Sequence, residues 1–326
     1  MSILITGAGG FIGQALAKAL AGTPGVNFLT LTDVIEPPAP SGQSNTQIAT
    51  VKADLTTRDT CRALLATEFT DMYLLHGIMS GASEANLPLG LAVNVDSLRN
   101  ILDVLGEKHE GGSPRPVRIV YPSSLAVFGG PEVLASPVTE STITLPQSSY
   151  GAQKHICEVL FNDFSRRGIV DACIVRLPTI IVRPGKPSGA ASSFCSGIVR
   201  EPLNGEESVL PVSKDLKLWV CSTRTIIRNL VQAREVQFPP DAYSRIVNLP
   251  GVTVTVQDIL DGLEQVGGEE ALQRVVERPD PAVQQIVGSW PAIFDIQRAL
   301  AMGFHPDGGL TETIHAYIED YGHNAP

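Results

Sequence analysis

A glycine-rich turn directly after a short apolar run is the feature that most constrains the fold of this chain. Residues 2–6 (Ser-Ile-Leu-Ile-Thr) are typical of a buried parallel strand. Gly7, Gly10 and Gly13 follow at three-residue spacing, and residues 11–21 have a helical pattern. Such a unit lets backbone N–H groups approach a phosphate at the start of the helix, although a plain strand–helix turn has the same pattern. The turn therefore predicts a parallel sheet and, as one of two interpretations, a phosphate site.

The alternation of strands and helices continues through more than half of the chain. Further segments of this kind are strands at 26–33, 47–52, 72–76, 117–121, 172–176 and 244–249 and helices at 58–67, 88–109 and 149–167. This repetition predicts an α/β fold with a doubly wound parallel (Rossmann) sheet. Prolines and glycines become frequent after Pro178, which predicts a smaller C-terminal lobe for the substrate. We expect residues 1–177 and about 214–249 to form the sheet domain, and residues 178–213 and about 250–326 to form the lobe.

An acidic residue at the end of the second expected strand indicates which ligand the glycine turn binds. Asp33 follows Gly13 by 20 residues, where a carboxylate can accept hydrogen bonds from both hydroxyls of a ribose. It would repel a 2′-phosphate, no arginine or lysine lies within the next 12 residues, and Glu36 adds negative charge. The sheet domain is therefore predicted to bind NAD rather than NADP. Asp54 and Leu55 end the third strand, either beside the adenine ring or as a solvated strand end.

Three polar residues carry the predicted chemistry. Tyr150 and Lys154 lie four residues apart in an expected helix, which places them on one face. A tyrosine with a pKa of about 10 is a weak base at neutral pH, but a nearby lysine and oxidised nicotinamide favour its phenolate. Ser124 ends the fifth strand, at the sheet edge where ligands bind, and can hydrogen-bond the reacting oxygen. A surface Tyr–Lys pair is the alternative for this spacing alone; the combination predicts a catalytic set.

Composition limits the partners of the chain. It has 326 residues, and its net charge of −10 argues against nucleic acid or an anionic membrane as partner. No apolar run is long enough to cross a bilayer. Its five cysteines lack metal-type spacing, so we expect no metal site. Reduced cysteines, and a first strand that leaves no room for a signal peptide, predict a cytoplasmic protein.

Together these motifs resemble the extended short-chain dehydrogenase/reductase superfamily, which includes NAD-dependent epimerases and dehydratases. Residues 6–13 are similar to its cofactor turn, residues 123–129 to its serine motif and residues 176–178 to the segment that passes beside the nicotinamide. In that serine motif the serine five residues before the glycine is catalytic, which selects Ser124 over Ser123.

The resemblance implies a set of cofactor contacts and a mode of assembly. A homodimer built on the helices at 88–109 and 149–167 is implied by the resemblance alone. The implied cofactor contacts are Gly7, Gly10, Phe11, Ile12, Gly13, Asp33, Asp54, Leu55, Leu75, Asn94, Tyr150, Lys154 and Pro178.

A narrower resemblance is to the D-erythronate dehydrogenase branch of this superfamily. It rests on residues 176–205 together with Ser80-Gly81, residues 248–251 (Asn-Leu-Pro-Gly) and residues 289–291 (Ser-Trp-Pro). The branch is implied to oxidise the C2 hydroxyl of a four-carbon sugar acid with NAD.

Two positions depart from the superfamily pattern. His76 and Gly77 stand where two alanines are usual, and Phe128 stands where many members have tyrosine. The histidine is either a substrate ligand or, as we favour, a packed imidazole. The phenylalanine removes one hydroxyl that we expect near the substrate.

The carboxylate of a sugar acid needs hydrogen-bond donors or a cation. The segment after the sixth strand offers several, Lys186 included, and a helix that starts near Ser192 could present its amide groups. An ordinary polar or structural role is the alternative for each of them. The expected substrate contacts are Ser80, Ser124, Tyr150, Thr179, Arg183, Ser192, Ser193 and Arg224.

The sequence thus predicts an NAD-dependent dehydrogenase of a small hydroxy acid. Tyr150 accepts the hydroxyl proton, Ser124 orients the oxygen, and Lys154 holds the nicotinamide ribose and tunes the tyrosine. A sugar-nucleotide epimerase or dehydratase is the first alternative, but it would need basic residues for a diphosphate in a lobe where they are sparse. A carbonyl reductase of a less polar ketone is the second. A non-catalytic NAD-binding protein would have no need of the serine–tyrosine–lysine set.

Overall fold

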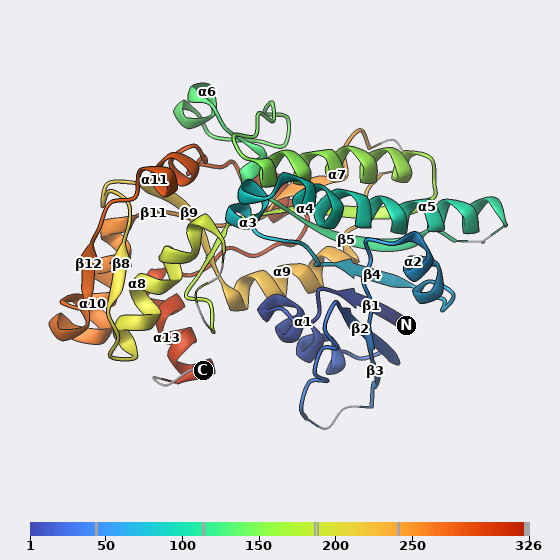
Figure 1. Ribbon diagram of the computed structural model, residues 1–326, viewed down its shortest axis with the longest axis horizontal. Coiled ribbons are helices and arrows are strands. Elements are labelled where there is room, and N and C mark those ends of the chain that lie inside the picture. Colours follow the sequence, from blue (N-terminus) through green and yellow to red (C-terminus); the bar gives the residue numbers. More distant parts are fainter. Residues whose placement is uncertain (43–44, 113–114, 186, 188, 240–241, 323–326) are drawn as a thin grey trace.

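A parallel sheet forms the centre of the larger domain (Figure 1). The computed structural model describes residues 1–42, 45–112, 115–185, 187, 189–239 and 242–322. Within these residues the sheet has seven strands in the order β10-β6-β5-β4-β1-β2-β3, and every neighbouring pair is parallel. The strands are β1 (Ser2–Thr6), β2 (Phe28–Asp33), β3 (Gln47–Lys52), β4 (Asp71–Leu74), β5 (Val117–Ser124), β6 (Val170–Leu177) and β10 (Ile246–Asn248). The predicted doubly wound sheet is confirmed.

The strand order fixes where a ligand can bind. From β1 the chain proceeds outward to β2 and β3, and it then returns to the other side of β1 with β4, β5 and β6. In sheets of this kind the crevice beyond the carboxyl ends of the strands, where the order reverses, receives the ligand. Here that point lies between β1 and β4.

Helices cover both faces of the sheet. On one face α1 (Phe11–Ala21) packs against α9 (Thr223–Glu235), and their apolar sides close one core. On the other face α2 (Arg58–Leu64), α5 (Ser97–Glu110) and α7 (Ser149–Arg166) close a second core (Figure 1).

The helix expected at 88–109 is divided in the structure. It consists of α4 (Leu87–Leu91), a π-helical turn (Ala92–Asp96) and α5, and α3 (Ser80–Ala85) precedes it. The apolar pattern runs through all three parts, so the pattern alone could not reveal the wider turn. Such turns often mark functional sites, and this one carries Asn94 towards the cleft described below.

The smaller lobe has its own sheets and core. A three-stranded sheet joins β7 (Thr179–Ile181), β9 (Lys217–Ser222) and β11 (Val252–Thr255), and β8 (Ser208–Leu210) pairs with β12 (Val275–Glu277). The remaining helices are α6 (Pro131–Ala135), α8 (Phe194–Leu203), α10 (Val256–Leu272), α11 (Pro281–Gly288), α12 (Gln297–Ala301) and α13 (Leu310–Tyr321).

The division into two domains stays a prediction, with two refinements from the sheet and core. β9 falls in the range expected for the larger domain, yet it pairs with the strands of the lobe. Ala299 and Phe304 fall in the range expected for the lobe, yet they are buried in the core beneath α1 and α9. In the structure β9 therefore belongs to the lobe, and the segment with Ala299 and Phe304 packs on the larger domain.

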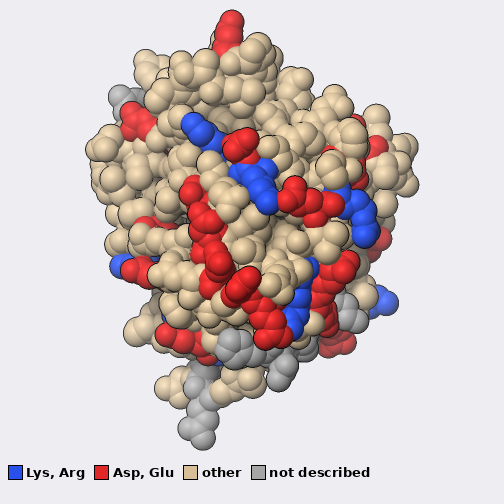
Figure 2. All heavy atoms as spheres, turned by 90° about the vertical axis from the view of Figure 1, so that its left-hand side faces the viewer, with Lys and Arg blue, Asp and Glu red and all other residues tan. Residues whose placement is uncertain are grey.

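The outer side of the lobe is mostly acidic or uncharged (Figure 2). The exposed acids of α10 include Asp261, Glu264 and Glu269. Across the described ranges, no helix is long and apolar enough to cross a membrane.

Candidate active site

A cleft of about 530 Å³ lies at the carboxyl ends of the strands, at the predicted point between β1 and β4. Its walls are the glycine turn, the loops after β2, β3 and β4, the end of β5, the first turns of α7 and the segment after β6. Every predicted cofactor contact lines this cleft except Asn94, and every predicted substrate contact lines it except Arg224. The structure thus brings together residues that lie up to 186 positions apart in the sequence.

The glycine turn fits a phosphate group. Gly7 has a φ of +65°, and a Cβ there would lie 2.6 Å from the backbone nitrogen of His76. A Cβ on Gly13 would lie 2.5 Å from the carbonyl oxygen of Gly7, so α1 packs closely on the turn only with glycine. The helix begins at Phe11 with no capping side chain and no acidic residue in its first turn. Its free N–H groups and dipole therefore suit an anion such as the pyrophosphate of NAD.

Asp33 lies beside this turn and is held in one orientation. Its carboxylate accepts hydrogen bonds from the backbone nitrogens of Gly9, at 3.0 Å, and Val34, at 2.7 Å. Both contacts fix the negative charge at the end of β2, where it lines the cleft. A carboxylate in this place fits two ribose hydroxyls and opposes a 2′-phosphate.

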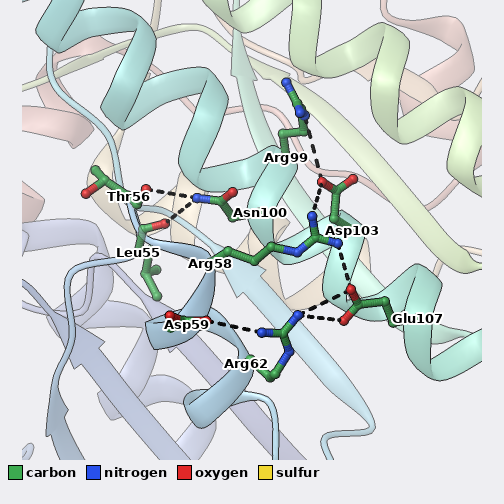
Figure 3. A network of polar contacts seen from close by, with 9 residues as sticks. All are labelled: Leu55, Thr56, Arg58, Asp59, Arg62, Arg99, Asn100, Asp103 and Glu107. Carbon is green, nitrogen blue, oxygen red and sulfur yellow. Dashed lines mark hydrogen bonds and ion pairs between the residues drawn. The ribbon is translucent and has the colours of Figure 1, made fainter.

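The loop after β3 is fixed by α5 (Figure 3). Asn100 donates hydrogen bonds to the carbonyl oxygens of Thr56, at 3.0 Å, and Leu55, at 3.4 Å. Arg58 and Arg62 of α2 both reach Glu107 of α5. Leu55 and Thr56 line the cleft, as Asp54 does, so this network holds the wall predicted for the adenine ring.

Ser124, Tyr150 and Lys154 line the same cleft. Ser148 caps α7 by accepting a hydrogen bond from the nitrogen of Gly151, which puts Tyr150 in the first turn. A Cβ on Gly151 would lie 2.1 Å from the carbonyl oxygen of Ala126, so glycine allows α7 to pack on the turn that follows Ser124. The Nζ of Lys154 lies 5.7 Å from the centroid of the Tyr150 ring.

Burial shifts the pKa values of both titratable members of this set. Burial raises the pKa of Tyr150 to about 12 and lowers that of Lys154 to about 8. The Lys154 ammonium donates a hydrogen bond of 2.9 Å to the carbonyl oxygen of Pro122. The free protein therefore keeps the phenol protonated at neutral pH, and a further positive charge in the cleft is needed to favour the phenolate.

A buried ion pair supports the set from behind. Arg176 makes two hydrogen bonds to Glu158, and Ser123 donates a third to the same carboxylate at 2.6 Å. Burial alone would raise the pKa of Glu158, but these hydrogen bonds and the arginine charge hold it below its ordinary value. Because Ser123 is committed to this pair, the neighbouring Ser124 is the serine whose hydroxyl is left for the cleft.

His76 has a structural environment. Its Nδ1 lies 2.6 Å from the Thr6 hydroxyl and its Nε2 lies 2.8 Å from that of Ser97. Ser97 gives its own proton to the carbonyl oxygen of Val93, so the histidine carries its proton on Nε2. Burial and the charge of Lys154 lower the pKa of His76 to about 3, which keeps it neutral. Both contacts agree with a packed imidazole, and the ring also lines the cleft.

Asn94 supports the cleft without lining it. Its side chain bonds the backbone nitrogen and oxygen of Ile78, the hydroxyl of Ser83 and the side chain of Gln153. The amide is therefore committed to the loop after β4, and this loop lines the cleft.

Two of the segments that carry the narrower resemblance meet beside the cleft. The hydroxyl of Ser80 accepts a hydrogen bond from the nitrogen of Ala191, and Gly81 donates one to the carbonyl oxygen of Gly189. A Cβ on Gly81 would lie 2.5 Å from that oxygen, so this close approach requires glycine. Thr179, Ser192 and Ser193 also line the cleft. Sequence reasoning missed Met79, Arg200 and Trp290, although Trp290 belongs to the Ser-Trp-Pro motif.

Three expectations about the substrate end need correction or lie outside the description. Arg224 is not at the cleft because Glu319 and Asp320 of α13 bind its guanidinium. Phe128 is fully buried and packs against Phe294 and Arg176, so it leaves no missing hydroxyl at the substrate. Lys186 lies outside the described residues.

No group of three or more potential metal ligands occurs within the described part of the chain. All five cysteines are free and buried.

Comparisons with known proteins agree with this geometry. The model of the NAD dependent epimerase/dehydratase family matches residues 3–236. A D-erythronate dehydrogenase of Cupriavidus necator is 41% identical over 99% of both chains. Another from Haemophilus influenzae is 40% identical over 98% of this chain and 99% of that one.

A solved structure shows the same architecture. It is described as the nucleoside-diphosphate-sugar epimerase from Agrobacterium tumefaciens and is 35% identical to this chain. It has a TM-score of 0.91 and covers 98% of this chain and 94% of its own. The predicted cofactor, NAD, and the predicted class, an NAD-dependent oxidoreductase, are both confirmed. With a cofactor turn, an acidic strand end and a serine–tyrosine–lysine set around one cleft, the chain belongs to the NAD dependent epimerase/dehydratase family.

Proposed function

We propose that this protein oxidises the C2 hydroxyl of a small, D-erythronate-like sugar acid to the 2-oxo acid. The observation that carries the proposal is the contact of Ser80-Gly81 with residues 189–191, beside the cleft that the catalytic set lines. Both segments belong to the pattern of the D-erythronate dehydrogenase branch, and two full-length relatives at 40–41% identity bear that name.

Each catalytic residue has a defined role in this proposal. When NAD is bound, its nicotinamide supplies the hydride acceptor and a positive charge. Tyr150 accepts the proton of the substrate hydroxyl on its phenolic oxygen, and Ser124 donates a hydrogen bond to the same substrate oxygen. Lys154 lowers the cost of the phenolate and holds the nicotinamide ribose, while its ammonium is fixed by Pro122.

The substrate carboxylate is bound by the wall of hydroxyl groups at Ser80, Thr179, Ser192 and Ser193. This wall matters because the protein as a whole has a net charge of −10 and would otherwise repel an acid. Arg183 and Arg200 also line the cleft.

A sugar-nucleotide epimerase is the second candidate because one solved relative carries that description. A nucleoside diphosphate sugar needs several cations beyond those that serve NAD. Among the residues described, the cleft has only Lys154, Arg183 and Arg200 as cationic side chains, and Arg200 is paired with Glu201. This scarcity favours the small acid. A less polar ketone, the substrate of a carbonyl reductase, would make no use of the hydroxyl groups that line the cleft at Ser80, Thr179, Ser192 and Ser193.

The test is a comparison of substrates with purified protein and NAD. D-erythronate should be oxidised, and its uncharged lactone and a UDP-sugar should react far more slowly. Ser192→Ala and Ser193→Ala should each be compared with wild type, and at least one should raise KM for the acid roughly ten- to hundredfold while NAD affinity is kept. Equal activity on the neutral analogue, or turnover of the UDP-sugar, would refute the hydroxy-acid proposal.

Assembly and location complete the proposal. A homodimer would form on α5 and α7, where Ile156 and Val159 expose apolar side chains. Five buried, unpaired cysteines suit a reducing compartment such as the cytoplasm.

A further inference from the structure

Arg183 is a cation without a carboxylate partner. Its side chain is half-buried in the cleft, and its Nε donates a hydrogen bond of 3.2 Å to the hydroxyl of Ser196. Its two terminal nitrogens have no hydrogen-bond partner within the described part of the chain, and no ion pair joins it to an acid there. Burial lowers the pKa of this guanidinium. A half-buried charge without a counter-ion is unfavourable, so an anionic ligand would stabilise this arrangement.

The guanidinium points to the cofactor end of the cleft. Its central carbon lies 6.0 Å from the centroid of the Phe11 ring. Phe11 is the first residue of α1, whose N–H groups have no capping side chain and no acid in the first turn. The cation and the helix start therefore face one another across the part of the cleft that suits a phosphate.

The backbone is strained at the residue that turns Arg183 towards this place. Val182 has a φ of +51°, and it is the only non-glycine residue with a positive φ in the described chain. A β-branched residue rarely adopts this conformation, and strain of this kind tends to collect at binding sites. The segment is also held from the lobe, because Arg200 of α8 donates a hydrogen bond to the carbonyl oxygen of Arg183.

We infer that Arg183 binds the pyrophosphate of NAD from the lobe side of the cleft, opposite the glycine turn. This assigns it to the cofactor and not to the substrate carboxylate for which its position in the sequence suggested it. The contact would tie the lobe to the cofactor, because Ser196 and Arg200 of α8 hold the arginine. The inference depends on the cofactor and stands or falls independently of the substrate.

Direct binding without any substrate tests the inference. The affinities of wild type, Arg183→Ala, Arg183→Gln and Arg183→Lys are measured by calorimetry with NAD, with ADP-ribose, and with adenosine, which has no phosphate. Arg228→Ala is the matched control, because it removes an exposed arginine of α9 outside the cleft. Thermal melts establish that each variant is folded.

Arg183→Ala and Arg183→Gln should lower the affinity for NAD and for ADP-ribose roughly ten- to hundredfold and leave the affinity for adenosine unchanged. Arg183→Lys should recover part of the loss, since it keeps the charge without the planar fork. Arg228→Ala should bind all three ligands as wild type does. If the alanine variant does not fold, the inference is tested by the ADP-ribose affinities of the other two variants. Arg183→Lys should then bind ADP-ribose more tightly than Arg183→Gln. Unchanged NAD and ADP-ribose affinity in the arginine variants would overturn the inference, and a raised KM for the acid alone would assign Arg183 to the substrate carboxylate.

Discussion

The ammonium group of Lys154 should destabilise the free protein while it serves the reaction. The side chain is 7% exposed, and burial lowers its pKa from 10.5 to about 8. One pKa unit corresponds to about 1.36 kcal/mol, so keeping this charge buried costs about 3 kcal/mol at pH 7. Replacing it by methionine also removes the hydrogen bond to Pro122, which contributes about 1 kcal/mol. Lys154→Met should therefore raise the free energy of unfolding by about 2 kcal/mol at pH 7.

The sign of the pH dependence follows from the lowered pKa. Below pH 8 Lys154 is protonated in both states, and the full cost is present. Between about pH 8 and 10.5 the folded protein releases its proton first, so the unfolded state binds more protons and the stability of wild type rises relative to the variant. At pH 9.5 the cost should have fallen by about 2 kcal/mol, and the two proteins should be about equally stable.

Urea unfolding followed by tryptophan fluorescence, without cofactor, at pH 7 and pH 9.5 measures this difference. Burial raises the pKa of Cys157 to about 11 and that of Tyr150 to about 12, so both groups stay largely protonated at pH 9.5 in the folded proteins. Lys18→Met, which removes an exposed lysine of α1, is the control and should show no such pH-dependent gap. A variant that is less stable than wild type at pH 7, or a gap that does not change with pH, would refute the reasoning.

Three further changes probe the cofactor end, the chemistry and the support behind it. Tyr150→Phe keeps the ring and removes the proton acceptor, so kcat should fall by about 10² or more with NAD affinity largely kept; near-normal turnover would exclude this base. Asp33→Ala should weaken NAD binding and reduce the difference in affinity between NAD and NADP, both measured by titration. Comparable use of both cofactors by wild type would contradict the role of Asp33. Glu158→Gln leaves Arg176 buried beside a neutral group and should cost about 3–5 kcal/mol in denaturant unfolding, whereas a loss below about 1 kcal/mol would show that the pair is dispensable.

The larger domain could be predicted because its signals are local. A strand, a glycine turn and a helix lie within 20 residues, and Asp33 is placed by the end of the next strand. Ser124 could be located because the carboxyl ends of parallel strands meet at one edge. Tyr150 and Lys154 could be placed on one face because residues four apart in a helix lie on the same side of it.

The remaining features depend on partners that are distant in the sequence. The π-helical turn at Ala92–Asp96 leaves the apolar pattern almost unchanged, so a plain helix was the natural expectation. Phe128 was expected near the substrate, but Phe294, 166 positions later, packs against it. Nothing in the local sequence indicates that Asn94 would be committed to the loop at Ile78.

Arg183 and Arg224 differ in their partners, and this difference shows what decides whether a cation of this protein can bind a ligand. Both are expected at the substrate, yet Arg183 lines the cleft, whereas Arg224 lies at the start of α9, which covers the larger sheet. On a chain with 34 acidic and 24 basic residues, an exposed arginine readily meets a carboxylate, as Arg224 does with Asp320. Arg183 escapes such pairing because a strained, half-buried segment holds it where the described residues offer it only the hydroxyl of Ser196. On an acidic protein, the total number of cations therefore says little about where anionic ligands bind. The cations that have no acidic partner are the better indicator.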